Sequence, residues 1–193
     1  MKRAVFLDRD GTINVDVGYL NHPDQLVLLP QAIAGLRLLS ESGLLLVIVT
    51  NQSGVARGLI PPQQLPVIQQ AFLDLMRSNA ILIAGYYACP HYPESSLPEY
   101  RSTCKCRKPA PGLILQAANE LDIDVQNSYV VGDKASDVQL AHNAGATGLL
   151  VLSGEGEKSL HTYPAEFKPP HAVCRDLSEA AEWIAGREKN HRQ

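Results

Sequence analysis

The stretch Val5-Phe6-Leu7-Asp8-Arg9-Asp10-Gly11-Thr12 decides the fold of this chain. Its apolar run ends abruptly at two carboxylates, Asp8 and Asp10, and Gly11 then lets the chain turn away. If the extended geometry continues, the two carboxylates point to the same side, about 7 Å apart. They repel each other unless a cation lies between them, and Mg²⁺ prefers one or two carboxylates together with substrate phosphate. The alternative is an ordinary strand-to-loop junction at the surface.

Working outward from this strand, short apolar segments alternate with amphipathic segments along the chain. We expect strands at residues 3–7, 44–49, 81–88, 128–131, 147–152 and 172–174. We expect helices at residues 31–42, 62–78, 111–121, 136–144 and 177–187. This alternation predicts βαβ units and a doubly wound, mostly parallel open α/β sheet of the Rossmann-like kind. In such sheets ligands bind at the carboxyl ends of the strands.

The composition fits one soluble domain over residues 1–193. The chain has 17 Lys+Arg against 20 Asp+Glu, a formal net charge of −3. With no basic stripe to neutralise a phosphate backbone, we expect no nucleic-acid partner. The apolar stretch 43–49 is too short to span a membrane and the N-terminal one too short for a signal peptide, so we expect a cytoplasmic protein. His191 and Arg192 end a mildly basic tail that we expect to fray.

Three further polar motifs follow the first one, and each stands after a predicted strand or before a predicted helix. Residues 50–53 offer hydroxyl and backbone N–H groups suited to anions. Residues 107–109 lead into the third predicted helix, and residues 132–137 supply two more acids after a strand. Taken alone, Lys108 is a solvated lysine before a helix and Thr50 a cap or turn residue. Their order and their positions favour one shared site.

The ordered set resembles the four motifs of the haloacid dehalogenase-like phosphatases, and the resemblance runs from residue 3 to about residue 152. It rests on Asp8-Arg9-Asp10-Gly11-Thr12, then Thr50, then Lys108, then Gly132-Asp133 with Asp137. The resemblance implies a two-step phosphoryl transfer, with Asp8 as nucleophile and Asp10 as acid and then base. Thr50 and Lys108 would hold the phosphoryl oxygens.

The same resemblance implies a catalytic magnesium site. Mg²⁺ would lie between the Asp8 carboxylate, the backbone carbonyl of Asp10 and Asp133. Asp137 would orient Lys108 rather than bind the metal. Neither assignment follows from spacing alone, and Mn²⁺ in place of Mg²⁺ stays open.

A second cluster lies in a polar loop after the third predicted strand. Cys89-Pro90-His91 and Cys104-Lys105-Cys106 form a C-x-H and a C-x-C pair. Three thiolates and one imidazole suit a closed tetrahedral Zn²⁺ site without an open position for water, so its role would be structural. The ligands would be Cys89, His91, Cys104 and Cys106, within a zinc-anchored loop insertion over residues 89–106. The alternative is a strand-end thiol beside an ordinary loop histidine, and Cys174 we expect to be a small buried hydrophobe.

The chain leaves no room for a cap domain, so loops must select the substrate. Its motifs resemble the D-glycero-D-manno-heptose 1,7-bisphosphate phosphatases of bacterial surface-sugar synthesis, including lipopolysaccharide core, which remove the 7-phosphate. The resemblance implies a small-molecule sugar bisphosphate as partner. It implies sugar contacts at Asp16, Val17, Gly18 and Tyr19, phosphate or hydroxyl contacts at Thr50, Asn51, Gln52 and Ser53, and positive charge at Arg107, Lys108 and Lys134.

Two other functions stay open. Histidinol-phosphate phosphatases share the catalytic motifs and a similar zinc loop. Their substrate carries a cationic amine and calls for an acidic pocket, whereas Arg107 and Lys134 are basic. The second alternative is a non-catalytic zinc-loop interaction module. We expect a monomer, and the anomer of the heptose stays open.

Overall fold

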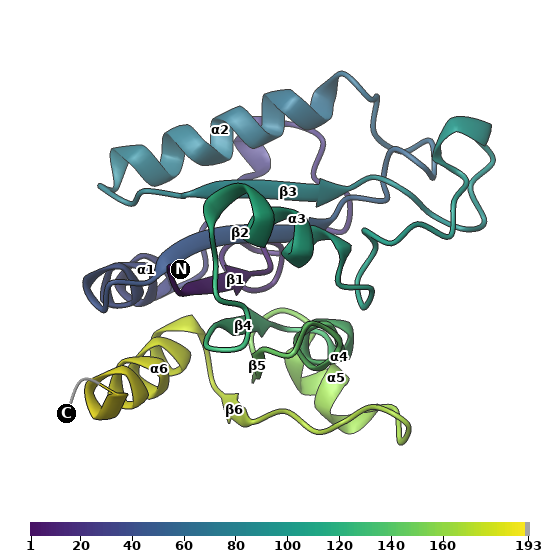
Figure 1. Ribbon diagram of the computed structural model, residues 1–193. Helices are drawn as coiled ribbons and strands as arrows, with labels where there is room; N and C mark the ends of the chain where they lie inside the picture. The colour runs from purple at the N-terminus through teal and green to yellow at the C-terminus, as the bar shows by residue number, and fades with distance from the viewer. Residues whose placement is uncertain (192–193) are drawn as a thin grey trace.

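One parallel sheet forms the centre of the computed structural model, which describes residues 1–191. Within this range six strands pair in the order β3-β2-β1-β4-β5-β6 (Figure 1). The strands are β1 Ala4–Leu7, β2 Leu45–Asn51, β3 Gly85–Cys89, β4 Tyr129–Gly132, β5 Thr147–Val151 and β6 Ala172–Cys174. The chain adds β2 and β3 on one side of β1 and then crosses to β4 on the other. The predicted α/β class and parallel sheet are confirmed.

Helices cover both faces of the sheet. Helices α1 (Ala32–Glu41), α2 (Gln64–Ser78) and α6 (Leu177–His191) lie on one face, and α3 (Gly112–Leu121) and α4 (Ala135–Ala144) on the other (Figure 1). Successive strand side chains alternate between two cores: Val5 and Leu7 join the first, Ala4 and Phe6 the second. Both faces of β1 are buried, which explains why its sequence is a continuous apolar run.

The switch in strand order at β1 positions the site. The carboxyl end of β1 lies between those of β2 and β4, so residues that follow these three strands meet at one edge of the sheet. Between β3 and α3 the chain forms a long loop with one short 3₁₀ turn, Pro98–Tyr100. Among residues 1–191, no helix combines the length and the apolar character needed to cross a bilayer.

Two predicted boundaries were wrong and one helix was missed. The third strand begins at Gly85 rather than at residue 81. Ile81 is instead buried in the segment that precedes the strand. An apolar run alone does not distinguish a strand from a buried segment without regular structure. The last helix continues past residue 187, and a short helix α5 (Gly156–His161) was not expected. Arg192, in the tail expected to fray, lies outside the described residues.

Candidate active site

A buried lysine links the carboxyl ends of β1, β2 and the start of α4. The ammonium of Lys108 lies 2.9 Å from Asp8 Oδ1 and 2.6 Å from Asp137 Oδ1. It also donates to the backbone carbonyl of Val49, at 3.1 Å. An ammonium has three donors, and these three acceptors use all of them. Lys108 is therefore held in one position, with its charge directed at Asp8, instead of being solvated.

Three carboxylates gather around this lysine. Oxygens of Asp8, Asp133 and Asp137 lie within 4.8 Å of one another, and all three residues are buried. Burial raises the pKa of Asp8 to about 6, with Lys108 opposing and Asp137 adding to the rise. Burial likewise raises the pKa of Asp133 to about 8, and the charges of Asp8 and Asp137 add to it. So much negative charge in one buried place calls for a cation.

Asp133 offers a free oxygen for such a cation. Its Oδ2 accepts a hydrogen bond from the backbone N–H of Glu155, at 2.8 Å. Its Oδ1 is buried and has no hydrogen-bond partner among residues 1–191. An unpaired buried oxygen is costly, and coordination of a hard divalent cation would satisfy it.

Two glycines make room for the Asp133 carboxylate. A Cβ at Gly11 would lie 2.2 Å from Asp133 Oδ2, and one at Gly154 would lie 2.4 Å from it. Both glycines have positive φ, +84° and +58°. The chain therefore approaches this carboxylate from two loops that admit no side chain. Residues and geometry here fit a magnesium ion.

Asp10 lies beside the cluster, and its carboxylate is surrounded by donors. Arg9 donates to it from Nε (3.1 Å) and Nη2 (2.8 and 2.7 Å). Asn14 Nδ2 and Gln52 Nε2 add hydrogen bonds of 2.9 and 2.8 Å. Burial raises the pKa of Asp10, but the charge of Arg9 and these hydrogen bonds outweigh it and lower the pKa below its usual value. In this arrangement Asp10 is a carboxylate.

The end of β2 carries the polar residues predicted to meet phosphate. Gln52 Nε2 also donates to Thr50 Oγ1, at 2.8 Å, so Gln52 bridges Thr50 and Asp10. Asn51 Oδ1 accepts a hydrogen bond from the backbone N–H of Lys108, at 3.1 Å. The β2 end thus fixes the backbone of the lysine loop as well as lining the site.

Two adjoining cavities open above these groups. The inner cavity, of about 80 Å³, contacts Asp8 and Asp10, and the outer one, of about 730 Å³, contacts Arg107. The predicted residues that line both are Asp16, Gly18, Tyr19, Asn51, Ser53, Lys108 and Lys134. Val17 lines neither cavity, and its side chain is 46% exposed.

Charged side chains border the outer cavity. Lys134 Nζ lies 3.1 Å from Asp16 Oδ2. Burial lowers the pKa of Lys134, but the nearby carboxylates outweigh it and raise the pKa. Arg57 was not among the predicted site residues, but it lines this cavity and stacks on the Tyr92 ring, with its guanidinium carbon 3.8 Å from the ring centroid. The signal was available, because Arg57 lies in the same loop as Ser53.

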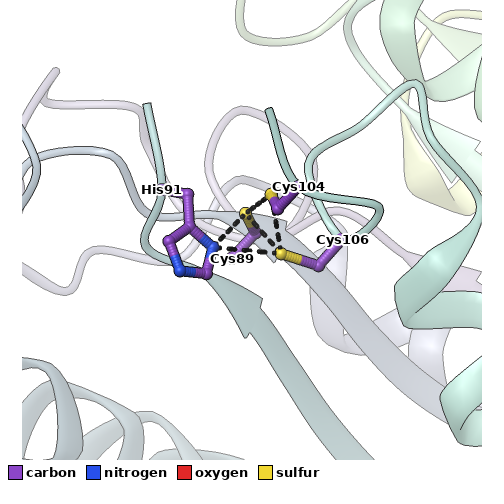
Figure 2. Close-up of side chains that lie close together, drawn as sticks. All are labelled: Cys89, His91, Cys104 and Cys106. Carbon is purple, nitrogen blue, oxygen red and sulfur yellow. Dashed lines mark hydrogen bonds between the residues drawn. The ribbon is translucent and has the colours of Figure 1, made fainter. Parts of the chain in front are cut away.

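The four predicted zinc ligands converge after β3 (Figure 2). Cys106 Sγ lies 2.9 Å from Cys89 Sγ and 3.0 Å from Cys104 Sγ. His91 presents Nδ1 to the sulfurs, 3.3 Å from Cys106 Sγ. Burial raises the pKa of Cys104, but hydrogen bonds from Cys106 and Cys89 outweigh it and lower the pKa to about 6. Three sulfurs and one imidazole nitrogen in contact fit a tetrahedral metal centre.

The cysteine and histidine cluster is connected to the acid cluster. Cys106 is followed directly by Arg107, whose Nη1 donates to the backbone carbonyl of His91, at 3.2 Å. The backbone N–H of Gln52 donates to the carbonyl of Cys89, at 2.8 Å. The cysteine cluster therefore anchors the segments that carry Arg107 and Lys108.

A doubly wound parallel sheet, with an acid pair after β1 and a buried lysine against further acids after β4, defines a hydrolase of the haloacid dehalogenase-like class. A family model described as HAD-hydrolase-like matches residues 105–180. The chain belongs to the D-glycero-beta-D-manno-heptose-1,7-bisphosphate 7-phosphatase family, as its curated relatives show.

Three of these relatives illustrate the match. The Yersinia pestis protein of that name is 46% identical over 154 residues, which is 79% of this chain and 81% of that protein. The Escherichia coli K12 protein of that name is 44% identical over 183 residues, 94% of this chain and 87% of that protein. A crystal structure of D,D-heptose 1,7-bisphosphate phosphatase from B. bronchiseptica, complexed with magnesium and phosphate, has a TM-score of 0.83 and 32% identity, covering 97% of this chain and 99% of that chain.

Proposed function

We propose that this chain removes the 7-phosphate of D-glycero-beta-D-manno-heptose 1,7-bisphosphate and leaves the 1-phosphate, in bacterial surface-sugar biosynthesis. The observation that carries the proposal is identity of 44% to a relative of that name over 94% of the chain. The beta anomer follows the names of these relatives. We further propose that the protein acts in the cytoplasm and that it is a monomer. Size-exclusion chromatography with light scattering tests the oligomeric state.

In the first step, a carboxylate oxygen of Asp8 attacks phosphorus, and the bond from phosphorus to the sugar oxygen breaks. The product on the protein is an aspartyl-phosphate. Lys108, fixed beside Asp8 by three acceptors, and Thr50 are placed to neutralise the oxygens of the transferred group. Because phosphoryl transfer depends mainly on positioning and charge, the buried and fully bonded Lys108 supports this assignment.

Asp10 would move the proton. It gives a proton to the departing sugar oxygen, and then takes one from the water that attacks the aspartyl-phosphate, which releases inorganic phosphate and restores Asp8. The ionised form, which the donors around Asp10 favour, suits the second step. A phosphate dianion bound beside Asp10 favours the protonated form needed for the first, since like charges raise a carboxyl pKa.

Asp8, Asp133 and the backbone carbonyl of Asp10 are the groups that would hold Mg²⁺. When bound, Mg²⁺ supplies positive charge at the transferred phosphoryl group. The unpaired Oδ1 of Asp133 and the raised pKa values of Asp8 and Asp133 support this assignment. Asp137 has a different task, because its Oδ1 contacts Lys108 and its Oδ2 accepts the backbone N–H of Lys134.

We assign Zn²⁺ to Cys89, His91, Cys104 and Cys106, as a structural ion that anchors the loop between β3 and α3. The mutual contacts of their sulfur and nitrogen atoms support the assignment. Metal analysis of freshly purified protein tests it: zinc at about one per chain is expected for a closed four-ligand site. Protein free of zinc, but folded with a normal Tm, would contradict it.

The outer cavity would hold the second phosphate. Arg107 and Lys134 line it, together with Arg57. Two arginines and a lysine suit a second dianion better than the cationic amine of histidinol phosphate. Two acids also line this cavity, Asp16 and Glu155, and Asp16 is already paired with Lys134.

Phosphate release by the purified protein with Mg²⁺ is the test of the proposed function. The substrates are the beta and alpha anomers of the heptose bisphosphate and histidinol phosphate. We expect the highest kcat/KM on the beta anomer, and no release with EDTA. Preference for histidinol phosphate would overturn the heptose assignment. An Arg107→Ala variant sharpens the result: its KM should rise about tenfold or more for the bisphosphate, since a charged contact is lost.

A further inference from the structure

Among the residues that the structure describes, Arg9 has the largest fully buried side chain, although in the sequence it lies between Asp8 and Asp10 at the end of β1. Its side chain is only 1% exposed. Burying an arginine is costly unless its donors are paired. Here Nε and Nη2 bind the Asp10 carboxylate and Nη1 donates to the hydroxyl of Tyr86, at 2.9 Å.

The contact with Asp10 fixes the direction of that carboxylate. Arg9 binds both oxygens, Asn14 binds Oδ1 and Gln52 binds Oδ2. Two arginine nitrogens on one carboxylate hold its plane as well as its position. The Asp10 side chain keeps 18% exposure, and it lines the inner cavity together with Asp8. The carboxylate is thus held from behind and open toward the place of reaction.

Tyr86 anchors Arg9 from another part of the sheet. It lies on β3, two strands away from β1, and its ring packs edge-on against Phe72 of α2, with centroids 5.9 Å apart. The hydrogen bonds run without a break from Tyr86 through Arg9 to Asp10, and on through Gln52 to Thr50. The rigid sheet and helix α2 therefore fix the far end of Arg9.

We propose that Arg9 and Tyr86 are positioning residues that hold Asp10 where it meets the oxygen of the departing alcohol. The inference rests on the proposed role of Asp10 as the acid in the first step. Neither residue lines the two cavities: Arg9 is enclosed, and the hydroxyl of Tyr86 contacts Arg9. A different reading is that Arg9 only compensates a buried negative charge. The two differ in one respect: a positioning role matters most when the leaving group needs a proton.

Variants Arg9→Lys and Tyr86→Phe, assayed on substrates with different leaving groups, test the proposal. Lysine keeps the charge and loses the two-nitrogen contact, and phenylalanine keeps the ring and loses the acceptor of Nη1. p-Nitrophenolate leaves without a proton, whereas phenol and an alcohol need increasing help. With Mg²⁺, Arg9→Lys should lower kcat/KM, which covers the steps up to departure of the alcohol, about 100-fold on an alkyl phosphate and less than about fivefold on p-nitrophenyl phosphate. Tyr86→Phe should lower kcat/KM about three- to tenfold on the alkyl phosphate.

Tyr87→Phe is the matched control. Tyr87 is the next residue of β3, on the opposite face, and its hydroxyl donates to Glu120 at 2.8 Å, away from the cavities. This variant should retain wild-type kcat on every substrate. Equal losses of kcat/KM on aryl and alkyl phosphates would overturn the proposal and leave Arg9 a purely structural role. If Arg9→Lys fails to fold, Tyr86→Phe decides alone: a loss confined to poor leaving groups supports positioning, and unchanged rates on all substrates overturn it.

Failure of the proposed function has a separate signature. It appears in the wild-type protein, as poor turnover of heptose bisphosphate. The positioning test compares the loss of activity in a variant on an alkyl phosphate with its loss on an aryl phosphate. This comparison does not require heptose bisphosphate to be the substrate.

Discussion

Two clusters of potential metal ligands lie at the same edge of the sheet and are built in opposite ways. The acid cluster of Asp8, Asp133 and Asp137 is buried, consists of oxygens and borders an open cavity through Asp8. The cysteine and histidine cluster is mostly half-buried, and its four side chains supply the number and kind of ligands that a tetrahedral site needs. The first leaves room for a substrate phosphate, and the second leaves none. We therefore assign the chemistry to the acid cluster and a structural role to the cysteine cluster.

The electrostatic consequences differ as well. Like charges crowd the acid cluster, so its local arrangement opposes stability and depends on Lys108 and a cation. The cysteine cluster would gain stability from the proposed zinc ion, because binding free energy there is folding free energy. Substitution of Asp8 should therefore lower activity more than stability, and substitution in the cysteine cluster should lower stability more than activity.

The largest effect is expected for Asp8→Asn. An amide cannot form the aspartyl-phosphate, so turnover should fall by about 10³-fold or more. The Tm in EDTA should not fall, because burial raises the pKa of Asp8 to about 6 in spite of Lys108, so the ionised carboxylate opposes folding at neutral pH. Phosphate release and thermal unfolding measure both. The exposed Asp24→Asn is the control, with activity unchanged. Residual activity within tenfold of wild type would refute the nucleophile assignment.

The next effect tests the buried ion pair that supports the acid cluster. Asp137→Asn removes the closest partner of Lys108, at 2.6 Å, and leaves its charge poorly compensated. Breaking a buried pair costs about 3–5 kcal/mol, measured by urea unfolding, and a displaced Lys108 should lower kcat about 100-fold.

A surface ion pair gives the matched control for Asp137→Asn. Asp74 pairs with Arg77 at 3.1 Å, and both are more than half exposed. Asp74→Asn should change the unfolding free energy by less than about 1 kcal/mol. Equal costs for the two substitutions would show that Lys108 is not a buried charge in need of that partner.

On the cysteine side, Cys104→Ser should remove zinc and lower the Tm by several degrees, because the loop loses its anchor. Activity should fall less than in Asp8→Asn, mainly through a higher KM as Arg107 loses its support from His91. Metal analysis, unfolding and kinetics measure the three effects. Cys174→Ala, a buried thiol in β6, is the control and should keep zinc content unchanged. Loss of zinc without any change in Tm would contradict a structural role.

Much of this site was accessible from the sequence, because polar residues that follow buried strands must meet at one edge of a parallel sheet. Asp8, Lys108 and the four cysteine-cluster residues could be assigned by that reasoning and by resemblance. Arg9 could not, because an arginine between two acids is usually a solvated residue, and only the fold brings Tyr86 to it. Gly154 was not predicted either, because its role is to leave space for the Asp133 carboxylate, and only the fold brings these two loops together.

The smallest effect concerns a histidine far from both clusters in the chain. His171 Nδ1 accepts the backbone N–H of Gly148, at 3.0 Å, and its ring stacks on His142 with centroids 4.9 Å apart. Burial lowers the pKa of His171, and the neighbouring His142 lowers it further. A histidine with a lowered pKa favours folding while neutral, so this contribution is present above its unfolded pKa and lost as pH falls through the folded pKa. Asp133, with its pKa raised to about 8, has the opposite sign and favours the metal-free fold at low pH.

The variant His171→Asn isolates the histidine, since asparagine Oδ1 can accept the same N–H without titrating. Between about pH 7.5 and pH 5, wild type should lose about 1–2 °C more in Tm than the variant. The carboxyl contribution is common to both proteins and cancels in this difference. The exposed His161→Gln is the control and should follow wild type. Parallel pH curves for wild type and His171→Asn would mean that protonation of His171 costs the fold nothing.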